Sequence, residues 1–278
     1  LLELQSMVGF EIPKKYVDDL TSKINLVEKG LLSKKVLNTC MHLILTGSPG
    51  TGKTTLARLL HKILYGVGIL RKNVFIERNA TQLKGQHVGQ TTPKVLDAFA
   101  SAEGGTLFLD EAYALSATNS CGKRDSFAND ALATLLTEAE NRRTDVFVVL
   151  AGYADKMQVL LDADPGLRRR FPTFLNLPNY TAPELAKMAS IAAIERFDIK
   201  LVDGCEKKLC KYIRKSTNDM KRYNASLPII LVERAITNMA VRVQKSLGNI
   251  EEERKTKVEL KLKYDDFMES NSENSYHP

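Results

Sequence analysis

The sequence lacks several features that would place it in a class at once. No apolar run approaches the roughly 20 residues of a membrane-spanning helix. The first residues, LLELQSMVGFEIPKK, contain no basic segment followed by an apolar one, so neither a membrane protein nor a secretory signal is expected. An initiator methionine is absent as well, and we therefore expect a fragment or a processed form.

Cysteine is scarce and scattered. No two cysteines have the two-residue separation of a zinc knuckle or a redox motif. The usage favours reduced thiols in a compartment like the cytosol, so a cytoplasmic protein is predicted. The four cysteines are Cys40, Cys121, Cys205 and Cys210.

Charge of one sign dominates only slightly. Forty Lys and Arg residues against 33 Asp and Glu residues give a formal net charge of +7. Part of the excess lies in KKLCKYIRKSTNDMKRYN, residues 207–224. A basic face could meet nucleic acid, but it carries no interleaved aromatics and no groove-reading motif. A solvated helix face is the favoured interpretation, and nucleic acid is not expected as a partner.

The pattern of apolar residues predicts the fold class. The chain has 278 residues, 44% of them hydrophobic, which is a globular composition for one large domain or two smaller ones. Short apolar runs alternate with helical periodicity up to Pro178. Alternating strands and helices predict a parallel α/β sheet covered by helices. Strands are expected at 41–47, 73–80, 104–112, 145–153 and 172–178, and helices at 14–39, 54–68, 93–103 and 127–143.

After Pro178 the strand pattern stops. Helices are expected at 182–197, 204–216 and 231–247, so a small helical domain follows the α/β domain. The end of the chain, MESNSENSYHP, is polar and expected to be disordered. We therefore predict four parts: a linker at 1–10, an α/β domain at 11–177, a helical domain at 178–247 and a charged, partly disordered tail at 248–278.

The segment GSPGTGKT fits the phosphate-loop pattern G-x-x-x-x-G-K-[ST], and it lies between a predicted strand and a predicted helix. Glycines let backbone N–H groups face phosphates, and the helix N-terminus adds partial positive charge. Lys53 can reach the β- and γ-phosphates, and the Thr54 hydroxyl can ligate Mg²⁺. The predicted site for ATP and Mg²⁺ consists of Gly47, Ser48, Pro49, Gly50, Thr51, Gly52, Lys53, Thr54 and Thr55.

A pair of acidic residues complements this loop. In TLFLDEA, the four residues 106–109 lead to Asp110 and Glu111 at the end of a predicted strand. This is the edge where open α/β sheets bind ligands. Asp110 suits an outer-sphere role at Mg²⁺, and Glu111 could orient and deprotonate a water that attacks the γ-phosphate. An acidic pair after a strand can also simply cap a helix. About 60 residues downstream of a phosphate loop, the catalytic interpretation is favoured.

Six segments together resemble one clade of AAA+ ATPases, which holds the stage V sporulation protein K-like proteins and the red-type rubisco activases. They are MVGF, GSPGTGKTT, GQHVGQTTPK, TLFLDEAYAL, VVLAGYADKM and DPGLRRRFP. The resemblance covers roughly Leu2 to Leu247. It implies an α/β nucleotide domain with a helical lid, assembled into a homohexameric ring. It also implies that Val8 and Gly9 of MVGF bind the nucleotide.

The resemblance assigns further roles. Gly152 and Tyr153 stand where AAA+ proteins place a polar γ-phosphate sensor, although the pattern in this clade is A-G-Y. GLRRRF matches the segment that holds the arginine finger, which reaches the ATP of a neighbouring subunit. Arg170, just before Phe171, best fits the finger. Arg168 and Arg169 remain alternatives, and one of the three could instead pair with acids at the subunit interface.

The helical lid departs from the pattern of the relatives. They carry N-A-R followed shortly by a second arginine, whereas this chain reads NASLPIILVERA. Ser226 takes the first arginine position and Ile229 the second. An arginine that would tie the lid to the γ-phosphate is therefore predicted to be absent, although Arg234 or Arg242 could substitute.

The loop LKGQHVGQTTPK, Leu83–Lys94, departs as well. In relatives the tip of this loop is an aromatic residue, usually tyrosine, which projects into the central pore and grips a polypeptide. His87 occupies that place, between two glycines that give the loop mobility. We expect His87 to contact a protein client, and the alternative is that it only makes hydrogen bonds within the loop.

These residues predict a Mg-ATP-dependent AAA+ ring motor that remodels a protein client, by threading a segment through the pore. A slow-turnover, nucleotide-switched scaffold is the first alternative, because the lid arginine is missing. A nucleic-acid-associated ATPase is the second, because the chain is basic. Asp110 and Glu111 weigh against the scaffold, and the resemblance weighs against nucleic acid.

Overall fold

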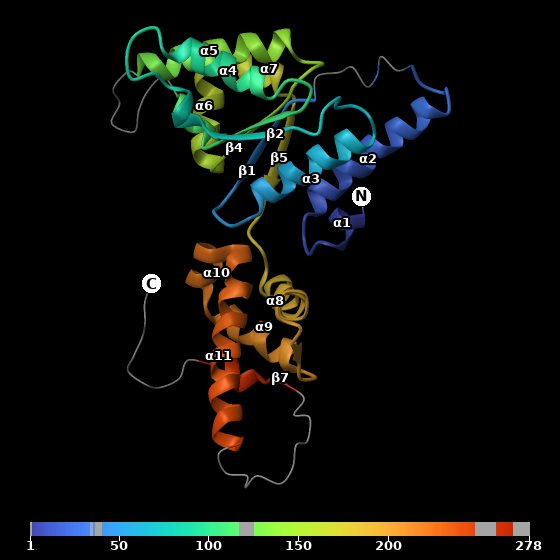
Figure 1. The fold of residues 1–278 in the computed structure, drawn as a ribbon, viewed down its shortest axis with the longest axis vertical. Coiled ribbons are helices and arrows are strands. Elements are labelled where there is room, and N and C mark those ends of the chain that lie inside the picture. Colours follow the sequence, from blue (N-terminus) through green and yellow to red (C-terminus); the bar gives the residue numbers. More distant parts are fainter. Residues whose placement is uncertain (1, 34–35, 37–40, 117–124, 248–259, 269–278) are drawn as a thin grey trace. The chain divides into compact units, whose positions relative to one another are not determined.

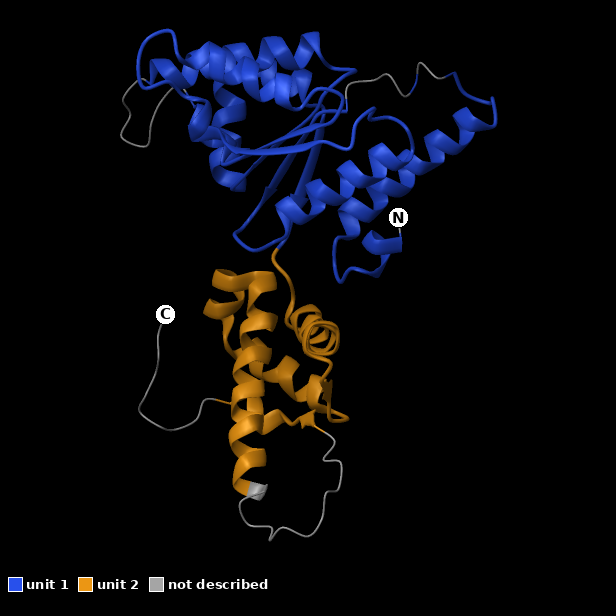
Figure 2. Cartoon of the chain, viewed as in Figure 1, with its two compact units in different colours: residues 1–178 blue, residues 179–278 orange. Residues whose placement is uncertain are grey.

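The computed structural model describes residues 2–33, 36, 41–116, 125–247 and 260–268. The chain divides into two compact units, Leu1–Pro178 and Asn179–Pro278 (Figure 2). None of the helices within the described ranges has both the length and the apolar character needed to cross a bilayer. Cys205 and Cys210, the two cysteines in those ranges, are free thiols.

A five-stranded parallel sheet forms the centre of unit 1, in the order β2–β3–β4–β1–β5 (Figure 1). Strands β1, β3 and β4 are almost wholly buried, as expected for strands covered on both faces. The predicted parallel α/β domain is confirmed. The strands are β1 (Leu43–Gly47), β2 (Phe75–Asn79), β3 (Thr106–Asp110), β4 (Phe147–Gly152) and β5 (Thr173–Leu177).

Helices cover the two faces of this sheet. In Figure 1, α4, α5 and α7 lie on one side of the strands, and α2 and α3 lie on the other. The first face includes Ile44, Leu107 and Val148, which share one buried cluster with residues of α4, α5, α6 and α7. The helices are α1 (Leu2–Ser6), α2 (Glu11–Glu28), α3 (Lys53–Gly66), α4 (Thr91–Ser101), α5 (Ser126–Asn141), α6 (Ala154–Ala163) and α7 (Pro165–Arg170).

Helix α2 is shorter than predicted. The apolar spacing favours a helix over 14–39, but the helix ends at Glu28. Gly30 has a left-handed φ of 71°, a conformation that a helix cannot continue through. The apolar pattern continues through Leu31 and Leu32, which explains why spacing alone overestimates the length.

Unit 2 is mainly helical, as predicted, with one small exception. Two residues each of β6 (Lys200–Leu201) and β7 (Lys261–Leu262) pair in parallel, so strands do not stop completely at Pro178. Residues 260–268, which fall in the predicted tail, pack on α11, and Phe267 is fully buried. The rest of that tail lies outside the described residues. The helices are α8 (Ala182–Phe197), α9 (Cys205–Lys215), α10 (Thr217–Tyr223) and α11 (Leu227–Leu247).

Candidate functional site

A cavity of about 290 Å³ opens at the carboxyl ends of β1, β3 and β4. The register of the sheet brings the segments together, because Thr46 of β1 lies beside Gly152 of β4, and Asn79 of β2 lies beside Asp110 of β3. Residues far apart in the sequence therefore share one wall. The lining residues are Pro49, Gly50, Gly52, Lys53, Thr54, Thr55, Asp110, Glu111, Tyr113, Gly152 and Tyr153.

The glycine-rich loop folds as a cradle at the start of α3. Gly50 and Gly52 have left-handed φ values of 69° and 90°, which other residues rarely adopt. A Cβ atom on Gly47 would lie 2.7 Å from the Leu177 carbonyl oxygen and from Thr51 Oγ1. Gly47, Ser48 and Thr51 are absent from the cavity wall, and the Thr51 hydroxyl donates to the Ser48 carbonyl at 2.8 Å. They shape the loop, while its other predicted residues face the cavity.

Lys53 begins α3 and reaches back over the loop. Its ammonium group donates to the carbonyl oxygens of Gly47 at 2.9 Å and Ser48 at 3.0 Å. Burial lowers the pKa of Lys53, and the nearby Asp110 carboxylate partly offsets this. A half-buried cation beside a helix N-terminus suits the binding of phosphate oxygens.

Asp110 ends β3 and Glu111 follows it directly, and both line the same cavity as Lys53. Asp110 Oδ1 accepts from the Glu111 backbone N–H at 2.9 Å. Glu111 has a left-handed φ of 53°, which is strained for a residue with a side chain. Its Oε2 accepts from Asn79 Nδ2 at 2.9 Å. The sequence analysis missed Asn79, which ends β2 beside Asp110 of β3 but follows the charged residues Glu77 and Arg78 and not an apolar run.

The residues present fit Mg-ATP. Lys53, the loop N–H groups and the helix N-terminus offer positive charge to a triphosphate. Thr54 and Asp110 offer the hydroxyl and carboxylate oxygens that Mg²⁺ prefers. Mg²⁺ is usually held by one or two side chains together with substrate phosphates. The arrangement can therefore bind a nucleoside triphosphate and hold a base near its last phosphate.

The N-terminal segment MVGF lies beside the glycine-rich loop. Phe10 is buried, and a Cβ on Gly52 would lie 2.8 Å from Phe10 Cζ. Lys14 Nζ donates to the Met7 carbonyl oxygen at 2.8 Å, which fixes the segment from the other end. Val8 and Gly9 are half-buried but do not line the cavity. Their predicted contact with the nucleotide remains a prediction.

The three candidate arginines of α7 have different surroundings. Arg168 pairs with Asp162 at 3.3 Å. Arg170, the favoured candidate, is half-buried; it donates to the Gly166 carbonyl at 3.3 Å and lies 3.8 Å from Glu140. Arg169 is exposed. None of the three lines the cavity of its own chain, and their predicted action on a neighbouring subunit remains a prediction.

The loop that carries His87 is exposed and ordered by local hydrogen bonds. The backbone N–H groups of Gln86 and His87 donate to the Gln90 side chain at 3.2 and 3.3 Å. His87 is exposed, and Val88 beside it is 93% exposed. The loop therefore presents two side chains, one of them apolar, at its tip.

In unit 2 both candidate substitutes for the missing lid arginine have partners. Arg234 donates to the Tyr212 hydroxyl at 3.1 Å and to the Phe267 carbonyl at 2.9 Å. Arg242 donates to both carboxylate oxygens of Asp266 at 2.9 Å. These bonds hold residues 260–268 against α11, so both arginines have a structural task. Ser226 is exposed and Ile229 is half-buried.

We expect Arg242→Ala to destabilise unit 2 by about 2 kcal/mol, a typical loss for hydrogen bonds to a charged group. Asp266 is 3% exposed and would lose its arginine partner, although the Lys263 backbone N–H still donates to its Oδ2. The affinity for ATP should stay unchanged. Thermal unfolding and ATP titration measure both, with the exposed Arg196→Ala of α8 as the matched control. Weaker ATP binding without a change in stability would instead make Arg242 a nucleotide contact.

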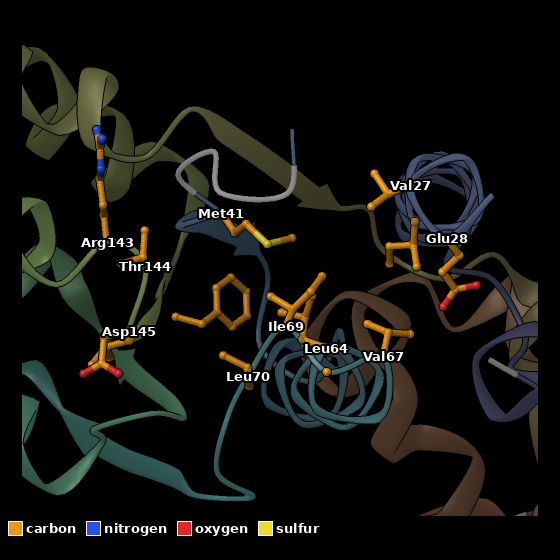
Figure 3. A pocket seen from close by; sticks show the side chains of 14 residues that line it. Val27, Glu28, Met41, Leu64, Val67, Ile69, Leu70, Arg143, Thr144 and Asp145 are labelled. Carbon is orange, nitrogen blue, oxygen red and sulfur yellow. The ribbon is translucent and has the colours of Figure 1, made fainter. Parts of the chain in front are cut away.

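A larger hollow of about 530 Å³ lies at the opposite, amino ends of β1 and β4. Figure 3 shows Met41, Leu64 and Ile69 gathered around it, with Glu28 and Arg143 at its edges. Arg143 already pairs with Glu140 at 3.5 Å. Its lining contains neither the glycine-rich loop with Lys53 nor the pair Asp110 and Glu111, so we take the smaller cavity as the candidate site.

Comparison with known proteins finds a match to one family model. Residues 43–179 match the model of the ATPase family associated with various cellular activities (AAA). That range contains the glycine-rich loop, both carboxylates and the α7 arginines. The match thus covers the whole wall of the candidate site.

Three relatives illustrate the similarity. The ESX-3 secretion system protein EccA3 of Mycolicibacterium smegmatis is 41% identical over 70% of this chain and 32% of its own length. Stage V sporulation protein K of Bacillus subtilis is 32% identical over 87% of this chain and 74% of its own length. The chloroplastic ribulose bisphosphate carboxylase/oxygenase activase of Cyanidioschyzon merolae is 33% identical, with shares of 86% and 80%. The chain thus spans about a third of the first relative and most of the other two.

Proposed function

This chain belongs to the AAA family of ATPases and hydrolyses ATP, and we propose that it is a ring-forming motor that uses Mg-ATP to remodel a protein client. The predicted clade is confirmed by the matches to stage V sporulation protein K and to the activase. The observation that carries the proposal is the cavity that unites Lys53, Asp110 and Glu111. One relative is named as an activase of an enzyme and another as part of a secretion system, which supports a protein client.

The side chains of the cavity have separate tasks in this proposal. Lys53 exchanges its bonds to loop carbonyls for the β- and γ-phosphates, and the loop N–H groups orient the phosphate chain. Thr54 and Asp110 hold Mg²⁺, which neutralises phosphate charge when bound. Glu111 accepts a proton from the attacking water, while Asn79 fixes one of its oxygens. Together they supply binding, orientation and a base.

We infer a ring from the arginines of α7, which one chain does not bring to its own cavity. None of the cations of α7 lines that cavity, although a guanidinium is well suited to the charge that develops on the γ-phosphate. Arg170 of one subunit would complete the cavity of the next in a homohexamer. Its weak contact with Glu140, at 3.8 Å, is easily exchanged for phosphate oxygens.

The scaffold alternative has one observation in its favour. Arg234 and Arg242 are engaged within unit 2, and Ser226 stands at the position of the sensor arginine. A lid without that arginine would couple weakly to hydrolysis, so basal turnover should be modest. The intact pair Asp110 and Glu111 favours an active motor over a scaffold.

Client binding can be tested with a variant that holds ATP. Glu111→Gln subunits should capture a fluorescein-labelled, permanently unfolded polypeptide in ATP and release it in ADP. Fluorescence anisotropy reports the binding. Equal binding in both nucleotides would contradict the motor and favour a passive scaffold.

The exposed loop should contact that client. We expect His87→Ala to keep basal ATP hydrolysis and assembly but to lose most of the stimulation by unfolded polypeptide. His87→Tyr should keep or strengthen it, because a larger aromatic surface grips better. Phosphate release with and without polypeptide, and the mass of the assembly, measure the two effects. If polypeptide stimulates ATP hydrolysis by His87→Ala fully, this side chain does not hold the client. If the variant fails to assemble, the loop has a structural role.

A further inference from the structure

Tyr113 is a part of the cavity wall that the roles above do not use. Its ring stacks on Tyr153, with centroids 5.6 Å apart and planes inclined by 24°. The Lys156 ammonium lies 4.6 Å from the Tyr113 ring centroid, within cation–π range. A Cβ on Gly152 would come within 2.9 Å of Tyr113 Cδ1, so a glycine at the end of β4 leaves the space that the ring occupies. Its neighbours therefore hold the ring in one place.

The backbone brings this ring to Glu111. Strand β3 ends at Asp110, Glu111 takes its left-handed conformation, and the short 3-10 helix η3 (Ala112–Leu115) follows. A strained residue persists only where its surroundings fix it, and such residues gather at functional sites. The turn places Tyr113 and Glu111 on the wall of the same cavity.

Tyr113 and Glu111 are two positions apart in the sequence and line the same cavity. Asn79 occupies Oε2 of that carboxylate, and a carboxylate can accept several hydrogen bonds. Burial, together with the charge and the hydrogen bond of Glu111, raises the pKa of Tyr113 to about 12. The hydroxyl therefore keeps its proton near neutral pH and acts as a donor.

We propose that Tyr113 is a positioning residue whose hydroxyl donates to Glu111 and, together with Asn79, aims the carboxylate at the attacking water. The inference rests on the proposed role of Glu111 as the base. Two donors from separate elements, Asn79 at the end of β2 and Tyr113 in η3, fix both the position and the rotation of the carboxylate. The stack with Tyr153 keeps the hydroxyl in place, because its ring cannot turn away without leaving its partner.

The effect should appear in turnover and not in binding. Reacting groups misplaced by about 1 Å can lose about 100-fold in rate, whereas Tyr113 has no proposed contact with the phosphates. Losing the hydroxyl should therefore lower kcat by about 10- to 100-fold, the loss typical for residues that hydrogen-bond to and orient a functional side chain. The affinity for ATP should stay unchanged.

Tyr113→Phe is the test, because it deletes the hydroxyl and keeps the ring that stacks on Tyr153. The matched control is Tyr65→Phe, which removes the hydroxyl of an exposed tyrosine on α3 outside the cavity. We expect Tyr113→Phe to lower kcat with unchanged ATP affinity and Tm, and Tyr65→Phe to change none of them. In a Glu111→Gln background, Tyr113→Phe should have no further effect on the residual rate.

Three results would overturn the inference. They are an unchanged kcat for Tyr113→Phe, a loss of ATP affinity with kcat retained, and a further fall in rate in the Glu111→Gln background. Failure of the proposed function is visible separately, since Glu111→Gln alone would then keep the wild-type rate. That outcome would also overturn the positioning role, while the wild-type ATPase rate shows that the protein itself is active.

Discussion

Glu111→Gln should bind ATP as tightly as the wild type but hydrolyse it about 10²- to 10⁴-fold more slowly, the range typical for the loss of a general base. The amide keeps the size of the side chain but cannot accept the proton of the attacking water. Phosphate release gives the rate, and calorimetric titration gives the affinity. Glu103→Gln is the matched control, because Glu103 is exposed and pairs only at the surface with Lys72.

A lysine variant of the same cavity should already fail at ATP binding, the step before hydrolysis. Lys53→Ala removes the ammonium that faces the phosphates, so ATP binding itself should be lost. Lys62→Ala, on the same helix but exposed, should bind and hydrolyse ATP normally.

If Glu111→Gln and the wild type hydrolyse ATP equally fast, Glu111 is not the base.

Arg170→Ala should bind ATP normally yet hydrolyse it poorly, with a loss of about 10³-fold or more if this residue is the finger. The expected cause is that its guanidinium serves the cavity of a neighbour. Mixing Arg170→Ala with Glu111→Gln subunits should then restore part of the activity. Some interfaces in a mixed ring pair a good finger with a good base.

The structure supplies controls for this mixing experiment. Arg168→Ala breaks a surface pair with Asp162 and should cost little. Arg169→Ala tests the exposed alternative directly. Absence of rescue in rings shown to be mixed would argue against Arg170, and rescue by Arg169→Ala subunits alone would transfer the role to Arg169.

Much of the fold is predictable because its signals are local. Helix α8 begins and ends as predicted, since Thr181 and Glu184 form a capping box and Pro183 lies in the first turn. The buried strands are short apolar runs, which are too short for a typical helix and are therefore predicted as strands. The length of helix α2 is overestimated because the spacing of apolar residues does not indicate the left-handed conformation of Gly30. The pairing of β6 with β7 joins residues about 60 positions apart, which no local pattern indicates.

The candidate site is predictable to the extent that it lies in contiguous motifs. The glycine-rich loop and the two carboxylates are recognisable from spacing alone, and the sheet brings them together. Asn79 and Tyr113 are missed because their importance lies in contacts with Glu111 and Tyr153. Which of the three arginines of α7 is the finger depends on contacts with a second subunit, and the sequence of one chain does not give those contacts.

The central claim is that ATP hydrolysis by this chain serves the remodelling of proteins. The most direct test measures phosphate release by the wild type alone, with a permanently unfolded polypeptide, with single-stranded DNA and with RNA, at one ionic strength. The account predicts a modest basal rate that the polypeptide raises and that neither nucleic acid changes. Stimulation by DNA or RNA but not by polypeptide would contradict it.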